Sequence, residues 1–253
     1  MKRGDFTNLA NDYAKYRPSY NSFVVKTILN SVGKEFHSIK AADVGAGTGI
    51  FTKCLLRAGL KNLVAVEPND DMRIRGIECL GKNMKFLNGS AEKTGLESNS
   101  FDLITMASSF HWTNTQLALK EFDRALSEKG VFCALWNPRL TEKSVSENEV
   151  QELLSTKFKV SSRVSSGLSG ITKELKEILT SSGIFNSVKY VDAVDVVNRT
   201  HEEYIGAWRS VNDVQFQLGK EKFEEFIGDV EKIITKREFV EVHYLTRAWI
   251  ASK

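Results

Sequence analysis

Short apolar runs recur along the chain, and each one ends beside a glycine-rich or polar segment. Runs of this length between turn residues are typical of strands that are buried on both faces. They predict strands at 41–44, 63–67, 84–87, 100–107 and 130–136, and two later runs predict closing strands at 186–195 and 239–250.

Helical patterns separate these runs. An apolar face at helical spacing is formed by Val24, Ile28, Leu29 and Val32, and another begins after Lys220. Asn69 is a suitable N-cap, and capping-box spacing predicts helix starts at Thr113 with Gln116 and at Thr200 with Glu203. Strands that alternate with helices between 41 and 136 predict a parallel sheet.

The most informative segment runs from Ala41 to Leu56, where a strand, a glycine turn and a helix follow one another. Asp43 precedes glycines at positions 45, 47 and 49. Glycine lets a ligand approach bare backbone because it has no Cβ and tolerates unusual dihedral angles. The dinucleotide pattern G-x-G-x-x-G fails, because Ile50 occupies the place of its third glycine, and no Gly-Lys-Ser/Thr follows as in a P-loop.

Glu67 ends the next predicted strand, about 20 residues after the glycine turn. An acid at this distance lies at the tip of the neighbouring strand, where it can accept hydrogen bonds from ribose hydroxyls. The sequence therefore predicts a nucleoside site between the glycine turn and Glu67.

Together these segments resemble the class I S-adenosylmethionine-dependent methyltransferases. The D-x-G-x-G-x-G turn resembles their first motif, Glu67 the acid that binds the ribose, and Ser90–Glu92 the loop beside the adenine, where relatives often have Asp in place of Ser90. The opening Tyr13–Pro18, the Phe-His-Trp after the fourth strand and the last strand resemble small-molecule methyltransferases of the type 11 kind, which include trans-aconitate methyltransferases.

The resemblance implies S-adenosyl-L-methionine as cofactor and S-adenosyl-L-homocysteine as product. It places the cofactor against Asp43, Gly45, Ala46, Gly47, Gly49, Glu67, Pro68, Met72, Ser90, Ala91, Glu92, Ser108 and Tyr13.

The implied fold is α/β and Rossmann-like, with a mostly parallel seven-stranded sheet whose last strand is antiparallel. We expect a single domain over residues 1–253. Its expected parts are an N-terminal lid and helix (1–37), a cofactor-binding core (38–137), a cap that includes strand six (138–238) and a closing strand (239–253). Aromatic residues within 1–20 predict the lid, and Ser161–Gly170 is expected to be a mobile loop.

The acceptor should lie at the carboxyl ends of the fourth and fifth strands, because these ends flank the glycine turn. His111 is the candidate general base, although positioning the substrate or packing beside Trp112 would also explain it. Candidate acceptor-binding residues are Tyr20, Trp112, Trp136, Arg139, Tyr204, Trp208 and Arg209. The alternative for the last three is simple packing, with Arg209 in solvent.

Composition narrows the class of protein. The chain has 253 residues, of which 42% are hydrophobic, as expected for one sizeable globular domain. Its 35 basic and 32 acidic residues give a net charge of +3, which disfavours nucleic acid as a partner. Three scattered cysteines fit neither a disulfide framework nor a metal site, and no signal peptide or membrane span is expected, so we expect a cytoplasmic protein, monomeric or dimeric.

The predicted function is therefore methyl transfer to oxygen, nitrogen or carbon of a small molecule. A non-catalytic cofactor-binding subunit and an RNA or protein methyltransferase remain as alternatives. A base-methylating role is disfavoured, because Ser108-Ser-Phe-His stands where an Asp/Asn-Pro-Pro-aromatic motif would be. Ile50 argues against a nicotinamide-dependent reductase.

Overall fold

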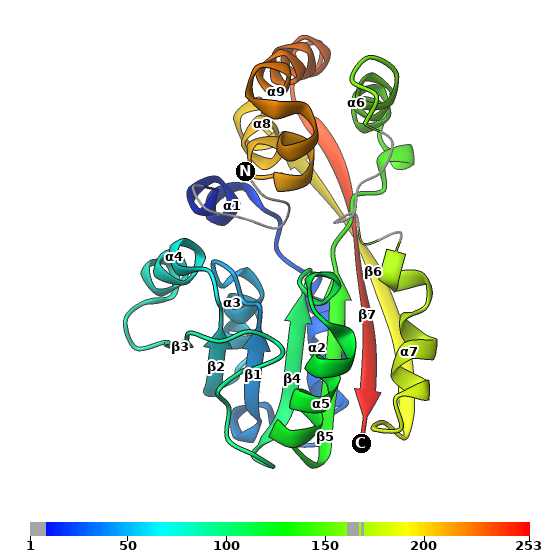
Figure 1. Cartoon of the computed structure of the whole chain (residues 1–253). Helices are drawn as coiled ribbons and strands as arrows, with labels where there is room; N and C mark the ends of the chain where they lie inside the picture. The colour runs from blue at the N-terminus through cyan, green and yellow to red at the C-terminus, as the bar shows by residue number, and fades with distance from the viewer. Residues whose placement is uncertain (1–8, 161–166, 168–169) are drawn as a thin grey trace.

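The structure is a computed structural model that describes residues 9–160, 167 and 170–253. A seven-stranded sheet with the order β3-β2-β1-β4-β5-β7-β6 forms its centre (Figure 1). The strands are β1 Lys40–Val44, β2 Asn62–Val66, β3 Lys85–Leu87, β4 Phe101–Ala107, β5 Leu126–Trp136, β6 Ser187–Arg199 and β7 Val240–Ser252. The first five are parallel and β7 is antiparallel to both of its neighbours, which confirms the predicted fold.

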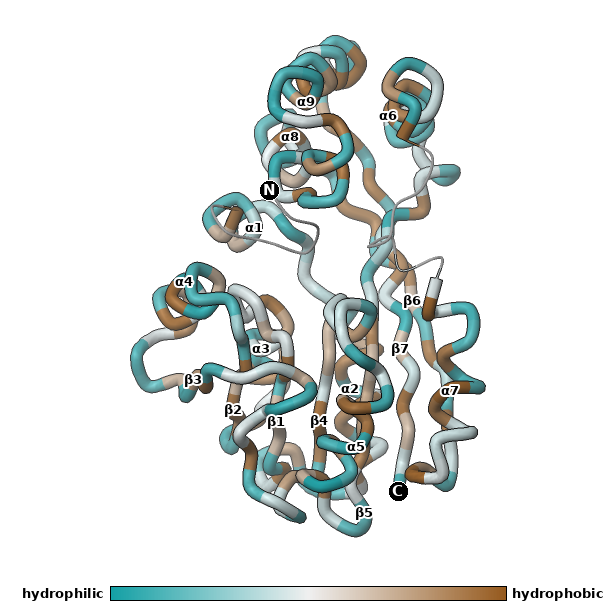
Figure 2. The backbone as a smooth tube through the Cα atoms, in the orientation of Figure 1, coloured by the Kyte–Doolittle hydropathy of each residue, from teal (hydrophilic) through white to brown (hydrophobic). Residues whose placement is uncertain are grey.

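Helices cover both faces of the sheet. The α-helices are α1 Ala10–Tyr16, α2 Ser22–Asn30, α3 Ile50–Arg57, α4 Asp70–Leu80, α5 Thr115–Ala125, α6 Val145–Thr156, α7 Leu175–Ser181, α8 His201–Arg209 and α9 Asn212–Ile234. Alternate residues of β5 point to opposite faces of the sheet. Cys133 packs in an apolar cluster with α2 and α3, and Phe132 packs in another apolar cluster with α5 and α7. Brown apolar stretches therefore follow the central strands, whereas α4 carries hydrophilic teal ones (Figure 2).

A cap stands beyond the carboxyl ends of the parallel strands. β7 pairs with β5 as far as Trp136 and Arg247, whereas its pairing with β6 continues to Arg199 and Val240. The two long strands thus leave the sheet as a ribbon, and α6, α8 and α9 lie around its end (Figure 1). These helices share a separate apolar cluster with the first residues of β7, such as Val240 and Val242.

Some element boundaries differ from the predicted ones. α5 begins at Thr115, because Asn114 rather than Thr113 is the N-cap, and its side chain accepts a hydrogen bond from the Leu117 amide. α9 begins at Asn212 instead of near Lys220, because Gly219, with a φ of 71°, joins two helical segments across a kink. The capping box at Thr200 is confirmed. Within the described residues, no helix has the length and apolarity needed to cross a membrane.

Parts of the predicted lid and of the predicted mobile loop consist of residues that the structure does not describe. Residues 1–8, 161–166 and 168–169 are not described, so the expectations for Phe6 and for most of Ser161–Gly170 lie beyond the described residues. The division of the chain into lid, core, cap and closing strand stays a prediction. The cap's apolar cluster nevertheless includes β7 residues, so the cap and the closing strand are packed together.

Candidate cofactor and acceptor site

A cavity of about 590 Å³ lies between the carboxyl edge of the sheet and the cap. This volume is within the range of small-molecule sites. The cavity is lined by residues from the glycine turn, the ends of β2, β4 and β5, the loop after β3, the segment around α1, and the start of α9. Segments far apart in the sequence therefore meet at the edge where open parallel sheets bind ligands.

The glycine turn lines the cavity through Gly45, Ala46 and Gly47. Gly45 and Gly47 have positive φ angles of 67° and 56°, which side-chain-bearing residues rarely adopt. A Cβ on Gly45 would lie 2.7 Å from the Ser109 side chain. The amides of Gly45 and Ala46 both donate to the Val66 carbonyl, so the end of β2 holds the turn in place.

Glu67 lines the same cavity and is 7% exposed. Its two carboxylate oxygens accept hydrogen bonds from the amides of Gly47 (2.8 Å) and Asn69 (2.9 Å). Burial raises the pKa of the carboxyl, while both amide hydrogen bonds act to lower it. Each oxygen has a second lone pair, so Glu67 can accept ribose hydroxyls while it still braces the turn. Pro68 and Met72, which the sequence also predicts to contact the cofactor, line the same cavity.

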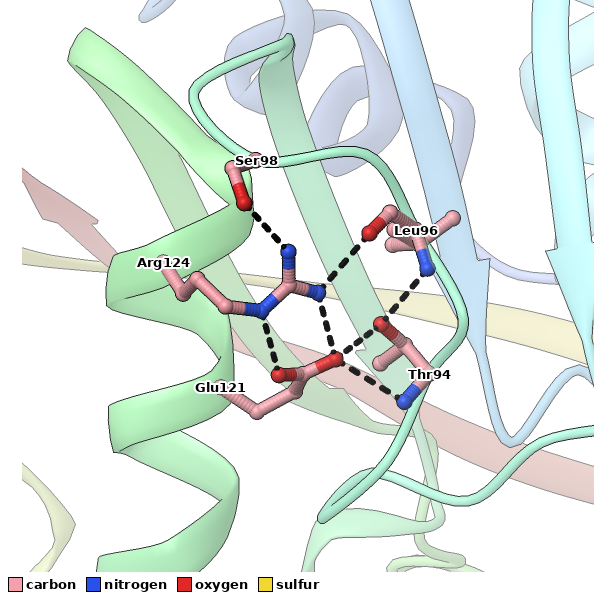
Figure 3. A network of polar contacts seen from close by, with 5 residues as sticks. All are labelled: Thr94, Leu96, Ser98, Glu121 and Arg124. Carbon is pink, nitrogen blue, oxygen red and sulfur yellow. Dashed lines mark hydrogen bonds and ion pairs between the residues drawn. The ribbon is translucent and has the colours of Figure 1, made fainter.

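The loop from Ser90 to Glu92 forms the next part of the wall. A polar network fixes the residues that follow it (Figure 3). Glu121 accepts hydrogen bonds from the Thr94 amide and hydroxyl, and Arg124 binds both Glu121 and the Leu96 carbonyl. The Arg124 guanidinium lowers the pKa of Glu121 to about 2, and the hydrogen bonds from Thr94 add to this effect. The network connects the residues after the loop to α5. It therefore fixes the position of the loop that is predicted to contact the adenine.

Asp43 and Gly49, two predicted cofactor residues, are not among the residues that line the cavity. Asp43 is fully buried below the turn and accepts hydrogen bonds from the Thr52 and Thr105 hydroxyls. Burial raises its pKa to about 6. Gly49 caps α3 with a φ of 82°, and a Cβ there would meet Leu80 at 2.5 Å. Both residues shape the turn from beneath it.

His111 does not fit the role of general base. It lies in the short helix Phe110–Trp112 and is absent from the cavity lining. Trp136 donates its indole N–H to His111 Nδ1 at 3.1 Å, and an indole nitrogen is a donor only, so the neutral ring carries its proton on Nε2. Burial lowers the pKa of His111 to about 4, against a smaller raising effect of Asp213. The ring packs at a tilt against Trp112, with ring centres 4.5 Å apart, and this corresponds to the packing alternative.

We expect His111 to stay neutral above about pH 5 in ring-nitrogen NMR titrations. Its folded pKa lies below the ordinary value of 6.5, so protonation favours the unfolded chain. Stability is then complete above about pH 6.5 and is lost as the pH falls toward 4. Compared with His111→Gln, which retains an acceptor for Trp136, the wild type should lose up to about 3 kcal/mol over this range. A ring that titrates near pH 6.5 would contradict this placement.

The segment around α1 covers the cavity on its open side. Tyr13, Arg17 and Tyr20 line it, and the Tyr20 hydroxyl lies 3.0 Å from the Ser108 hydroxyl. Arg17 lies over the Tyr13 ring and donates to the Ser210 hydroxyl and carbonyl. The Tyr16 ring packs on Gly206 of α8, where a Cβ would lie 2.2 Å from the ring. The segment is therefore attached to the cap at two places.

The predicted acceptor residues divide into two groups. Tyr20, Trp112, Trp136 and Arg139 all line the cavity. Tyr204, Trp208 and Arg209 do not, which corrects the prediction for α8. The two aromatic rings are buried in the apolar cluster of the cap, and Arg209 forms an ion pair with Glu224 on the outside.

The sequence interpretation missed several lining residues. Val211, Asn212 and Asp213 were not expected, because the predicted helix began near Lys220. Thr141 and Gln151 had no motif to mark them, since they come from the cap segments after β5. In the described part of the chain, no group of three His, Cys, Asp or Glu side chains could hold a metal ion.

Comparison with known proteins agrees with this geometry. Residues 42–134 match a family model described as a methyltransferase domain. An uncharacterized methyltransferase of Mycobacterium tuberculosis is 31% identical over 134 residues, which cover 53% of this chain and 52% of that protein. The chain thus spans about half the length of the curated relatives that it matches.

Two solved structures resemble the whole chain. A candidate type II methyltransferase of Anaeromyxobacter dehalogenans has a TM-score of 0.66 at 15% identity, with 94% of this chain and 98% of that chain covered. A phosphoethanolamine N-methyltransferase of Haemonchus contortus, in complex with phosphomonomethylethanolamine and S-adenosylhomocysteine, has a TM-score of 0.54 at 15% identity, with 98% and 57% covered. At these identities the likeness concerns the fold.

Proposed function

We propose that this chain, which carries a class I S-adenosylmethionine-dependent methyltransferase domain, transfers the methyl group of S-adenosyl-L-methionine to a small-molecule acceptor. The observation that carries the proposal is the shared cavity. Gly45, Gly47 and Glu67, which follow β1 and β2, line the same cavity as Trp112, Trp136 and Arg139, which lie at or beyond the ends of β4 and β5. A cofactor and an acceptor bound to these residues would share one cavity.

The cofactor residues fit a nucleoside with an amino acid tail. The bare turn from Gly45 to Gly47 allows close approach, Glu67 offers acceptor lone pairs to the ribose, and Met72 and Ala91 offer apolar contact to the base. When bound, the cofactor supplies a methyl group that its positive sulfur has already activated. The protein must then align the acceptor with that methyl group, and alignment can contribute roughly 7–11 kcal/mol.

A small acceptor is favoured over a polymer by the cavity itself. Residues of the α1 segment and of the start of α9 line it, and the chain's near-balanced charge disfavours nucleic acid. The Haemonchus contortus neighbour also binds a small molecule beside S-adenosylhomocysteine. Because His111 is not among the residues that line the cavity, we propose a transfer that depends on alignment and exclusion of water rather than on this histidine.

Ligand-induced changes in melting temperature test the cofactor assignment. S-adenosylmethionine and S-adenosylhomocysteine should raise the melting temperature of the purified chain, and calorimetry should give a saturable affinity for both. NADH should leave the melting temperature unchanged. Stabilisation by NADH alone would favour a nicotinamide-dependent enzyme and would overturn the proposal.

We further expect the α1 segment to close over bound ligand. Hydrogen exchange at residues 10–20 should slow when S-adenosylhomocysteine binds. Gly206→Ala should abolish most of this protection, because the new Cβ meets the Tyr16 ring at 2.2 Å and displaces α1 from the cap. Gly228→Ala is the matched control, since a Cβ there meets nothing within 4 Å. Equal exchange in free and bound wild type would contradict a lid role.

A further inference from the structure

We propose that the acceptor is held by an anionic group, a carboxylate or a phosphate, which binds at Arg139. This proposal rests on the proposed function and specifies the acceptor's chemical class. Arg139 lies three residues beyond the end of β5, on the wall of the cavity formed by the cap segments. Glu67 and the glycine turn, which line the same cavity after β2 and β1, are the residues proposed to bind the cofactor.

The Arg139 guanidinium is held in one orientation. Its side chain is 14% exposed, and Nη1 donates to Glu147 Oε1 at 3.1 Å. The guanidinium carbon lies 4.8 Å from the centre of the Trp208 ring and 5.3 Å from that of Tyr204. Stacking on aromatic faces and ion pairing fix a planar cation at little further entropic cost on binding.

This cation still has hydrogen-bonding capacity. A guanidinium has five N–H groups, and Glu147 accepts from Nη1 only. Within the described residues, no other hydrogen bond of this side chain has good geometry, although the Tyr244 hydroxyl lies beside it. Because Arg139 lines the cavity, its remaining donors can reach a ligand there.

Two neutral side chains extend the same wall. Thr141 and Gln151 both line the cavity, and neither side chain has a hydrogen-bond partner in the part of the chain that the structure describes. A hydroxyl and a carboxamide can each donate to an oxygen. Together with Arg139 they form a set of donors that matches the several oxygens of a carboxylate or phosphate.

Two acidic side chains, Glu147 and Asp213, affect which ligand charge this wall of the cavity can bind. Glu147 is 1% exposed and forms an ion pair with Arg139, so it balances the charge of the guanidinium. Asp213, also on the cavity wall, lies close enough to His111 to affect its pKa. Arg17 also lines the cavity, but it donates to the Ser210 hydroxyl and carbonyl, whereas Arg139 keeps donors for a ligand, and an anionic group is the complement of these donors.

Direct titration of small anions tests the proposal. Inorganic phosphate and succinate would each be titrated by NMR into protein saturated with S-adenosylhomocysteine, with tetramethylammonium as the cationic control. Glu147→Gln should tighten anion binding roughly 5- to 10-fold, because it removes the competing acid. The double variant Arg139→Gln/Glu147→Gln leaves no unpaired buried charge. It should weaken anion binding roughly 10- to 100-fold. Arg209→Gln, on the outside of the cap, should change nothing.

The outcomes separate the possibilities. Binding of phosphate alone assigns a phosphate, and binding of succinate alone assigns a carboxylate. A purely structural role of the Arg139–Glu147 pair predicts equal anion affinity in all variants, and this result would overturn the proposal. The proposal would also be overturned if neither the wild type nor Glu147→Gln binds an anion. If the wild type does not bind S-adenosylhomocysteine, the proposed function is overturned. Titration of the anions without S-adenosylhomocysteine would then still test the role of Arg139.

Discussion

Replacing Glu67 with Ala should raise the Kd for S-adenosylhomocysteine by roughly 5- to 150-fold. Two effects combine in this variant. The ribose hydroxyls lose their acceptor, and the amides of Gly47 and Asn69 lose the carboxylate that positions them. An unsatisfied buried polar group costs about 1–3 kcal/mol, which corresponds to the expected range. Isothermal titration calorimetry measures the change directly.

Glu67→Gln is the matched control for this prediction. Its carbonyl oxygen can still accept one amide hydrogen bond, whereas its amino group cannot accept the other. We therefore expect an affinity between those of the wild type and Glu67→Ala. Unchanged affinity in the alanine variant would show that the ribose lies elsewhere in the cavity.

Replacing Trp136 with Ala should lower the free energy of unfolding by about 3–5 kcal/mol, the usual cost of removing a large buried aromatic side chain. Trp136 is 1% exposed, its ring packs edge-on against Trp249 at 5.7 Å, and its indole N–H binds His111. Urea denaturation followed by circular dichroism measures the loss.

Trp136→Phe is the matched control, because it keeps most of the apolar volume and removes the indole N–H. It should cost less than the alanine variant and should leave His111 without its donor. A loss below about 1 kcal/mol for Trp136→Ala would mean that this side chain is not part of the core. From the sequence, Trp136 was expected mainly to bind the acceptor, whereas the structure gives it a role in stability as well.

The glycine turn and Glu67, which line the cavity, could be recognised in the sequence because their signals are local. Gly45 and Gly47 need positive φ angles, and Glu67 follows a strand at a fixed distance, so spacing along the chain is enough to recognise them. The sheet could be predicted for the same reason, because each strand is an apolar run beside a turn. Asp43 shows the limit of such signals, since the motif places it near the cofactor while burial puts it below the turn.

The acceptor side depends on contacts between distant segments, which periodicity does not reveal. Arg139 and Arg209 were equal candidates in the sequence. The structure separates them because Arg209 faces outward to Glu224, whereas the end of β5 places Arg139 at the cavity. The position of His111 after the fourth strand makes it a candidate base in the sequence, but its ring accepts a hydrogen bond from Trp136, the last residue of β5.

The start of α9 could not be predicted because of its kink. Gly219 reads as a helix end in the sequence, since glycine is a poor helix former. In the structure the helix continues on both sides of this residue, and its first turn brings Asn212 and Asp213 to the cavity. The long ribbon of β6 and β7, which supports the cap, likewise exceeds the predicted strand at 186–195.

Transfer of a labelled methyl group tests the central claim most directly. The purified chain would be incubated with S-adenosylmethionine that carries an isotopic label in its methyl group, together with a panel of small acids, amines and phosphate esters. Mass spectrometry would then identify the labelled product. We predict label in at least one small molecule together with an equal amount of S-adenosylhomocysteine, and loss of both in Glu67→Ala at limiting cofactor. Tight cofactor binding with label in no small molecule, or with label only in RNA or protein of a cell extract, would contradict the account.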